Sequence, residues 1–426
     1  MLDINFIREN LELVVTGLKR KYSSIDRSFL EKALELDEKR RSLITKLDDV
    51  RSQKNQASKE IATLSGDERN QKIAAMKQVG EEETKLTEEL NSIEPELTNM
   101  LLRIPNLPAQ DVPDGTEADN QPFKTVGTIP KFDFPPRDHV ELGELLDIID
   151  IEAAQKASGA RFYYLKNEAV LLEFALIQFA TQKLLKHNFV PVITPVLVKE
   201  EAMYATGFFP ADGNEVYHVN PGEDDLYLVG TSEVPLTMLH ADQILDINKL
   251  PLRYFGFSSC FRREAGSYGK DTKGILRVHQ FDKLEMFSFC GPDQSATEHE
   301  LIRSIEEEIF ADLGIPYQVI NICAGDLGAP AVKKYDIEAY IPTQEKYREV
   351  TSCSNYHEFT ARRAKIRFRD QEGKTQFVHT LNGTAIAIGR ALIAIIENNQ
   401  QADGSVIIPE PLRAYLNGQE VIKPRK

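Results

Sequence analysis

The chain has 426 residues, a hydrophobic content of 42% and a formal net charge of −15. This length suits two or three domains around a large core, and the apolar content excludes a disordered chain. No apolar run reaches the roughly 18 residues that span a membrane, and acidic residues interrupt the first segment, so we expect neither a membrane span nor a secretory signal.

The four cysteines, Cys260, Cys290, Cys323 and Cys353, lie far apart in the chain and form no C-x-x-C pair. We therefore expect neither a zinc site nor a disulfide framework. A reducing, cytoplasmic environment fits this pattern.

The first 104 residues are predicted to form a helical arm. A short amphipathic helix is expected over 2–18, and two tracts with an apolar residue every seventh position follow, separated by a turn near 65–68. Such tracts are typical of an antiparallel coiled coil, and about 35 residues in each helix would extend roughly 50 Å. Pro95 is expected to kink the returning helix. The repeating residues are Leu36, Leu43, Val50, Ala57 and Leu64 in the first tract, and Met76, Leu90, Leu97 and Ile104 with Val79, Leu86, Ile93 and Met100 in the second.

The outgoing helix carries a basic stripe, although the whole chain is acidic. Residues 39–59 contain seven basic and two acidic side chains, a local balance of +5. Such a stripe can dock on nucleic-acid phosphates, but an ordinary solvated helix face has the same composition. The basic residues are Lys39, Arg40, Arg41, Lys46, Arg51, Lys54 and Lys59.

Residues 105–140 contain seven prolines and are predicted to be a linker, followed by a second domain over 141–426. This domain lacks regular alternation of strands and helices, which predicts an α+β fold with a mostly antiparallel sheet flanked by helices. Strands are expected over 189–198, 225–229, 253–260, 283–290 and 376–380, and helices over 170–185, 301–313 and 385–398.

No Walker, Rossmann, zinc-protease or nucleophile-elbow motif occurs. Instead, Phe261-Arg262-Arg263-Glu264 precedes a glycine-rich basic loop over 265–274 and a returning strand. Arg262 on a strand could bind a phosphate, although F-R-x-E alone fits a surface hairpin equally well. Arg390 is expected two turns into a helix that starts at Gly383, amid apolar residues, where it needs a phosphate or a buried carboxylate as partner.

These segments resemble the three motifs of class II aminoacyl-tRNA synthetases: 187–195 resembles motif 1, 261–285 motif 2 and 383–390 motif 3. Within this class, the chain is identified as a member of the seryl-tRNA synthetases of the bacterial type, a resemblance that covers its whole length and includes the arm. The segments that carry it are 231–233, 261–274, 277–281, 348–355 and 379–384. The resemblance implies a cytoplasmic homodimer that attaches serine to tRNA(Ser), and also to tRNA(Sec), through a seryl-adenylate formed from ATP.

The resemblance also implies the site residues. Arg262 and Arg390 are the expected catalytic cations, acting on the α-phosphate and the γ-phosphate. The expected ATP-binding residues are Arg262, Arg263, Glu264, Val278, Phe281, Glu349, Val350, Thr351, Ser352 and Arg390, with Mg²⁺ held by Glu349 and Ser352. The expected serine-binding residues are Thr231, Ser232, Glu233, Arg262, Glu285 and Thr384. In this scheme Glu264 meets the adenine amino group, Phe281 stacks on the ring, and Glu285 and Thr384 meet the serine ammonium and hydroxyl. For Glu285, an ion pair with Lys283 or Arg262 is the structural alternative.

Two other functions are open to a chain of this kind. A class II paralogue that loads an amino acid onto a non-tRNA carrier would lack the arm. A nucleic-acid-binding protein with a decayed ligase domain would first lose Arg262, Glu264, Glu285 or Arg390, and all four are present. The zinc-dependent variant of the enzyme needs a Cys and His constellation that we do not find, so no zinc is expected.

Overall fold

The computed structural model describes residues 1–265 and 273–425. These form two compact units, Met1–Pro105 and Asn106–Lys426, which are described separately. The glycine-rich stretch predicted to form a basic loop lies, for residues 266–272, outside the described residues.

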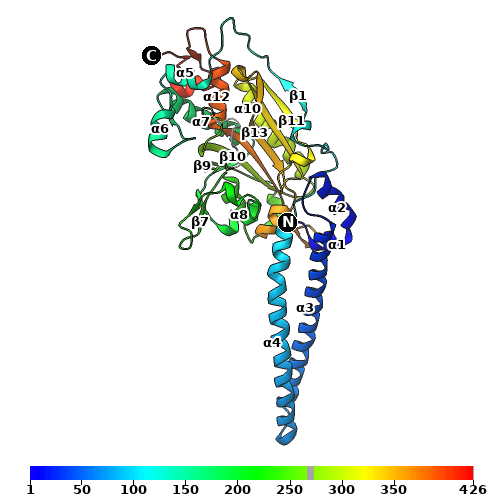
Figure 1. Cartoon of the computed structure of the whole chain (residues 1–426). Coiled ribbons are helices and arrows are strands. Elements are labelled where there is room, and N and C mark those ends of the chain that lie inside the picture. The colour runs from blue at the N-terminus through cyan, green and yellow to red at the C-terminus, as the bar shows by residue number, and fades with distance from the viewer. Residues whose placement is uncertain (266–272, 426) are drawn as a thin grey trace. The chain divides into compact units, whose positions relative to one another are not determined.

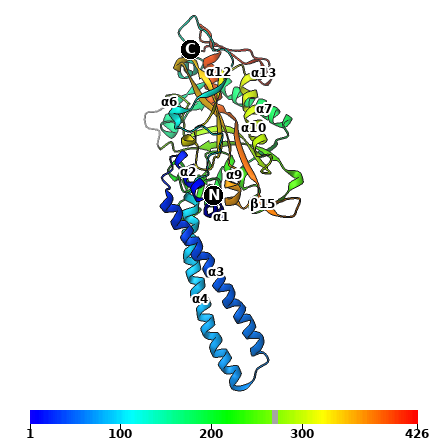
Figure 2. The same cartoon turned by 90° about the vertical axis from the view of Figure 1, so that its right-hand side faces the viewer.

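The first unit is dominated by α3 (Arg27–Ile61) and α4 (Gly66–Arg103), which lie side by side as an antiparallel hairpin (Figures 1 and 2). Apolar heptad positions such as Val50 and Ile93 are buried between the helices, whereas Leu64 and Met76 near the turn are only half-buried. The α4 helix continues through Pro95 without ending. The predicted coiled coil is therefore confirmed.

The start of the chain differs from the prediction of one helix over 2–18. Two helices, α1 (Ile4–Glu9) and α2 (Leu11–Arg20), meet at Asn10, whose φ of −131° is not helical. The Asn10 side-chain amide donates a hydrogen bond to the carbonyl of Phe6 at 3.1 Å. The backbone N–H of Asn10 donates to the same carbonyl at 2.9 Å, so Asn10 caps the end of α1.

Five of the seven residues of the basic stripe have an acidic partner within the arm, so the uncompensated charge is smaller than composition suggests. The pairs with Glu83 and Glu89 join solvent-accessible side chains, and such pairs are weak and screened by salt, whereas Asp37, 1% exposed, is buried. The pairs are Lys39–Glu89, Arg40–Asp37, Arg41–Asp37, Arg51–Glu83 and Lys54–Glu83.

The second unit contains an eight-stranded sheet of order β1-β11-β12-β13-β16-β10-β9-β4, antiparallel throughout except where β4 runs parallel to β9 (Figure 1). The predicted fold class is confirmed. The strands are β1 (Pro122–Val126), β4 (Val190–Ile193), β9 (Leu252–Phe261), β10 (Gln280–Cys290), β11 (Tyr317–Asn321), β12 (Lys333–Ile341), β13 (Lys346–Asn355) and β16 (His379–Ala387).

Several element boundaries differ from the predicted ones. The strand expected over 189–198 divides into β4 and β5 (Leu197–Lys199), which belong to different sheets. The helix expected from 301 is α10 (Ser295–Asp312), and strand β1 lies within the stretch 105–140. Strands β11, β12 and β13 are absent from the predicted elements.

Helices cover both faces of the sheet. On one face, α7 (Glu168–Lys186), α10 and α12 (Ile388–Asn398) pack against β10 residues such as Leu284 and Met286. On the other, α9 (Glu233–Met238) and α11 (Phe359–Ala364) pack against Phe287 and Phe289. Because side chains alternate along a strand, Glu285 shares this second face. No helix among the described residues is both long and apolar enough to span a bilayer.

Candidate active site

Most of the predicted site residues meet in one pocket, built from the β9–β10 hairpin, β13, β16 and the start of α12. Strands from distant parts of the sequence are neighbours in the sheet, which brings these residues together. The lining residues are Arg262, Glu264, Ile275, Leu276, Arg277, Val278, Phe281, Lys283, Glu349, Val350, Thr351, Ser352, Thr384, Ala387, Gly389 and Arg390.

Arg262 directly follows β9, and hydrogen bonds hold both its backbone and its side chain. Its backbone N–H donates to the carbonyl of His279 at 3.0 Å, and its Nε donates to the carbonyl of Gly230 at 3.4 Å. The guanidinium carbon lies 5.3 Å from the ring centroid of Phe281. The pocket therefore presents a cation beside an aromatic face.

Glu264 is fixed at the base of the hairpin loop. Its φ of +51° is left-handed, its carbonyl accepts a hydrogen bond from Arg161 at 3.1 Å, and its carboxylate accepts one from Arg277 at 2.8 Å. Arg277 is absent from the predicted site. It holds the carboxylate in the pocket by a charge-assisted bond.

The surroundings of Arg390 correct one prediction. Residues 383–387 are not helical but continue β16, paired with β10, so Arg390 is the third residue of α12 rather than two turns in. The first turn of this helix therefore lines the pocket, and the start of a helix favours anions. Arg390 Nη1 donates to the backbone carbonyl of Glu349 at 2.9 Å and lies 3.3 Å from its Oε2 atom.

Glu349 and Ser352 both line the pocket, although residues three apart on a regular strand point to opposite faces. The register between β12 and β13 shifts at this point, because Thr351 pairs with Ile337 but Glu349 pairs with Glu338. Such a bulge redirects side chains. Burial acts to raise the pKa of Glu349, but the charge of Arg390, followed by Lys334 and Arg262, outweighs it and lowers the pKa to about 2. Glu349 is thus ionised.

A buried polar network adjoins the pocket. Glu285, 1% exposed, pairs through Oε2 with Lys283 Nζ at 2.6 Å and accepts a hydrogen bond from the Thr384 hydroxyl at 3.0 Å. The Asn382 amide donates to Glu285 Oε1 at 3.0 Å and to Glu233 Oε2 at 2.9 Å. The ion pair with Lys283 that sequence offered as an alternative is therefore present, in addition to the contact with Thr384.

Hydrogen bonds of the Thr231 and Ser232 side chains hold the chain next to Glu233 in place. The Glu233 N–H donates to Thr231 Oγ1 at 3.2 Å, and the fully buried Ser232 hydroxyl donates to the carbonyl of Gly256 at 3.0 Å. Burial, followed by the nearby charge of Glu285, raises the pKa of Glu233 to about 7. Ser232 thus holds the backbone, while Glu233 is poised to change charge near neutral pH.

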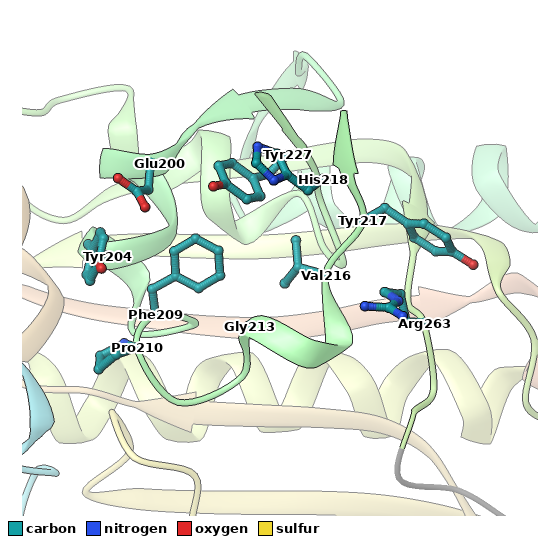
Figure 3. A pocket seen from close by; sticks show the side chains of 10 residues that line it. All are labelled: Glu200, Tyr204, Phe209, Pro210, Gly213, Val216, Tyr217, His218, Tyr227 and Arg263. Atoms are coloured by element: carbon teal, nitrogen blue, oxygen red, sulfur yellow. The ribbon is translucent and has the colours of Figure 1, made fainter. Parts of the chain in front are cut away.

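Arg263 does not line this pocket. It belongs to a second pocket, shown in Figure 3, together with aromatic residues of the segment 204–227. Arg262 and Arg263 are consecutive residues just after β9, and their side chains line different pockets.

Three polar residues at the site, Lys283, Arg277 and Asn382, were not among the predicted ligand-binding residues. Asn382 lies two residues before Thr384 on the same strand, a spacing that places both side chains on one face and could have indicated it. A further carboxyl, Glu306, accepts a hydrogen bond from Thr351 at 3.2 Å behind the pocket, and burial raises its pKa well above the ordinary value.

This arrangement suits two ligand parts. Two arginines, a helix N-terminus and an aromatic ring fit a polyphosphate joined to a flat heterocycle. The buried carboxylates, with the amide and hydroxyl beside them, fit a small ammonium-bearing ligand with a hydroxyl group.

Comparisons with known proteins agree along the whole chain. The seryl-tRNA synthetase N-terminal domain family matches residues 1–108, and the class II tRNA synthetase core domain family (G, H, P, S and T) matches 216–399. A serine–tRNA ligase of Clavibacter michiganensis is 46% identical over 100% of this chain and 98% of its own length. The seryl-tRNA synthetase of Pyrococcus horikoshii, solved in complex with ATP, is 41% identical over all of both chains, with a TM-score of 0.93. The cytoplasmic enzyme of Naegleria fowleri, solved with AMP, is 33% identical over 100% of this chain and 99% of its own, with a TM-score of 0.88.

Proposed function

We propose that this chain, which belongs to the seryl-tRNA synthetase family of class II ligases and attaches serine to tRNA, does so through a seryl-adenylate. In the first step a serine carboxylate oxygen attacks the α-phosphorus of ATP and pyrophosphate leaves. In the second, a hydroxyl of the terminal adenosine of tRNA attacks the serine carbonyl and AMP leaves. Neither step needs a nucleophile from the protein, so catalysis consists of positioning and charge stabilisation.

The observation that carries this proposal is that Arg262, Phe281 and Arg390 line one pocket. With adenine stacked on Phe281, the Arg262 guanidinium beside the ring reaches the α-phosphate and the attacking carboxylate, and Arg390 reaches the γ-phosphate. Glu264 accepts from the adenine amino group. ATP in the relative from Pyrococcus horikoshii supports this assignment.

Glu349 and Ser352 fit a Mg²⁺ ion that arrives with ATP. An ionised carboxylate and a hydroxyl are hard oxygen donors, and this ion commonly takes its other ligands from phosphates and water. When bound, it neutralises phosphate charge. The Arg390 contacts with Glu349 hold that carboxylate at the pocket wall.

The serine ammonium is assigned to Glu285 and Glu233, and its hydroxyl to Thr384 and Glu285. The Oδ1 atom of Asn382 is buried and, within the described chain, has no hydrogen-bond partner, so it offers a further acceptor. Lys283 neutralises part of the negative charge of Glu285 through its 2.6 Å ion pair. Alanine has no hydroxyl to bond with Thr384 and Glu285, which disfavours it.

The arm, proposed to span residues 1–104, binds the tRNA(Ser) backbone through its basic stripe, with tRNA(Sec) as a second substrate. Residues 105–140 connect it to the proposed catalytic domain, 141–426. A homodimer is proposed through α7 and β4, which expose large apolar side chains: Leu171, Phe174, Leu185, Val190 and Ile193. We assign the enzyme to the cytoplasm, where its substrates occur.

The test is ATP–pyrophosphate exchange with each of the twenty amino acids, followed by charging of tRNA(Ser). We expect exchange with serine alone, and transfer of serine to tRNA(Ser) by the same preparation. Exchange with serine but no charging of any tRNA would favour a ligase that loads another carrier. Charging without any adenylate detectable in rapid-quench samples would refute the two-step reaction.

A further inference from the structure

A second pocket lies outside the proposed ATP and serine sites. It is formed by α8 (Glu200–Thr206), the segment 209–218 and the small sheet that joins β5, β7 (Leu226–Leu228) and β6 (His218–Val219), as Figure 3 shows. Its volume is about 600 Å³. Pockets of this size accept ligands as large as a nucleotide.

Aromatic rings form the wall of this pocket. His218 stacks on Tyr227 with ring centroids 4.3 Å apart and planes 9° apart, and Phe209 packs edge-on against Tyr227 at 5.1 Å. Asp225 Oδ1 lies 2.9 Å from His218 Nε2 and fixes the orientation of the imidazole. Because His218 is exposed and its ring is held in place, it offers a preformed flat surface at little entropic cost.

Opposite charges mark the two ends of the pocket. Arg263 and Glu200 lie at opposite ends in Figure 3, with the rings of His218 and Tyr227 between them. In the described part of the chain, no acidic side chain forms an ion pair with Arg263. A ligand with an anionic group, a flat ring and an amino group would match this order of cation, aromatic surface and carboxylate.

The two pockets share one segment of chain. Arg262 lines the proposed ATP pocket and Arg263 the aromatic pocket. His279 connects them, because its Nδ1 lies 2.9 Å from the carbonyl of Arg262 and its ring lies 6.2 Å from that of Tyr217. A flexible chain with one end at Arg262 can therefore place its next unit in the aromatic pocket.

We infer that this pocket binds the nucleotide immediately before the terminal adenosine of the tRNA acceptor end. Its base lies against the His218–Tyr227 stack, its phosphate meets Arg263, and its exocyclic amino group meets Glu200. Single-stranded RNA is recognised mainly by stacking of its unpaired bases on aromatic side chains and by arginine contacts to phosphate. This inference rests on the proposed second step, which requires the terminal ribose to reach the pocket of Arg262.

The test separates the two steps in His218→Ala and Tyr227→Leu. We expect serine-dependent pyrophosphate exchange within twofold of the parent in both. Single-turnover transfer of serine from the enzyme-bound adenylate to tRNA(Ser) should fall about tenfold, the usual effect of losing one stacked base. Tyr227→Phe keeps the ring and should transfer at the parent rate. Phe123→Leu removes an exposed ring on β1 that lines neither pocket, and should also match the parent.

A tRNA(Ser) with an abasic site before its terminal adenosine completes the test. The parent should lose about tenfold in transfer to this tRNA, and His218→Ala should lose no more, because the same contact is already absent. Unchanged transfer in both ring variants, or losses that multiply with the abasic tRNA, would overturn the inference. Parallel losses of exchange and transfer would assign the rings to the first step instead. Absence of serine-dependent exchange in the parent would refute the proposed function separately.

Discussion

The arm and the catalytic pocket each contain a lysine–glutamate pair of nearly equal length in very different surroundings. Lys54 Nζ lies 2.7 Å from Glu83 in the arm, with the two side chains 50% and 22% exposed. Lys283 Nζ lies 2.6 Å from Glu285 at the site, with the side chains 8% and 1% exposed. An exposed pair is screened and easily exchanged for another partner, whereas each member of a buried pair depends on the other.

This difference shows how one chain can carry both exposed ion pairs that exchange partners and buried ion pairs that stay fixed. In the arm, RNA phosphates can take the place of glutamates such as Glu83 without leaving a buried charge unpaired. At the site, the buried pairs fix the positions of carboxylates before a substrate arrives. The arm is therefore suited to broad contact with a polyanion, and the site to selection of one small molecule.

The largest expected effect comes from removing the arm. Deletion of residues 37–93, closed by a short turn, should nearly abolish charging of tRNA(Ser) while leaving serine-dependent pyrophosphate exchange almost intact, since the phosphate contacts are lost but the pocket is not. The tRNA affinity of the parent should fall steeply with salt. Near-parent charging by the deletion variant would show that the arm only braces the fold.

A direct comparison of the two lysines comes next. Lys283→Met leaves Glu285 buried without its cation and should lower the free energy of unfolding by about 3–5 kcal/mol. Lys54→Met, the matched change in the arm, should move Tm by no more than about one degree. Thermal and denaturant unfolding of both variants give the two values, and equal effects would contradict the contrast between the regions.

The pocket cations should affect chemistry more than stability. Arg390→Ala or Arg262→Ala removes a donor from developing phosphate charge and should slow pyrophosphate exchange by about 10²–10³-fold. Arg413→Ala, which changes an arginine outside the pocket, serves as the control. Exchange within tenfold of the parent in either pocket variant would show that its arginine does not contact the phosphates.

Thr384→Val tests selection of serine by its hydroxyl. The change keeps the volume but removes the hydroxyl that donates to Glu285 at 3.0 Å. Serine should lose roughly 1–3 kcal/mol relative to alanine, the cost of one unpaired buried polar contact. The ratio of kcat/KM for the two amino acids measures this loss, and an unchanged ratio would exclude Thr384 from the serine pocket.

The smallest effect concerns pH. Burial and Glu285 raise the pKa of Glu233 to about 7, so the folded protein holds this proton at pH values where an unfolded glutamate has lost it. The contribution of Glu233 to stability therefore falls as pH rises from about 4.5 to 7. Relative to the parent, Glu233→Gln should gain a few degrees in Tm between pH 5 and pH 8. Parallel Tm profiles would show that Glu233 titrates normally.

The sequence predicted the arm well because a heptad repeat reports the packing partner directly. It placed the start of α12 wrongly, since residues 383–387 have an apolar composition that suits either a helix or a buried strand. These residues form a strand because they pair with β10, which lies about 100 residues earlier in the chain. Strand β13 was missed because pocket-lining polar residues such as Glu349 and Ser352 obscure its apolar alternation.

The site shows the same limit. Residues that match family motifs, such as Arg262 and Thr384, line one pocket, and their roles there stay predictions. The spacing from Thr384 places Asn382 on the same face of β16, but no local pattern reports its contacts with Glu233 in α9 and Glu285 in β10. The resemblance placed Arg263 among the ATP-binding residues, and in the structure it lines the pocket next to the one that Arg262 lines, so its contact with ATP stays a prediction.

Asn382 also bears on the chemical ageing of the enzyme. It precedes Gly383, and asparagine–glycine sequences in flexible chains deamidate readily because the following N–H is free to attack the side-chain amide. Here β16 pairs with both β10 and β13, which holds the backbone extended and opposes this attack. Replacement of Gly383 is not available as a second protection, because a Cβ there would lie 2.2 Å from the Ile302 side chain. Deamidation would turn the amide that joins Glu233 and Glu285 into a third carboxylate, and mutual repulsion would raise the pKa values of the carboxyls that we propose to bind serine. The working lifetime of the proposed serine pocket thus depends on the rigidity of one strand.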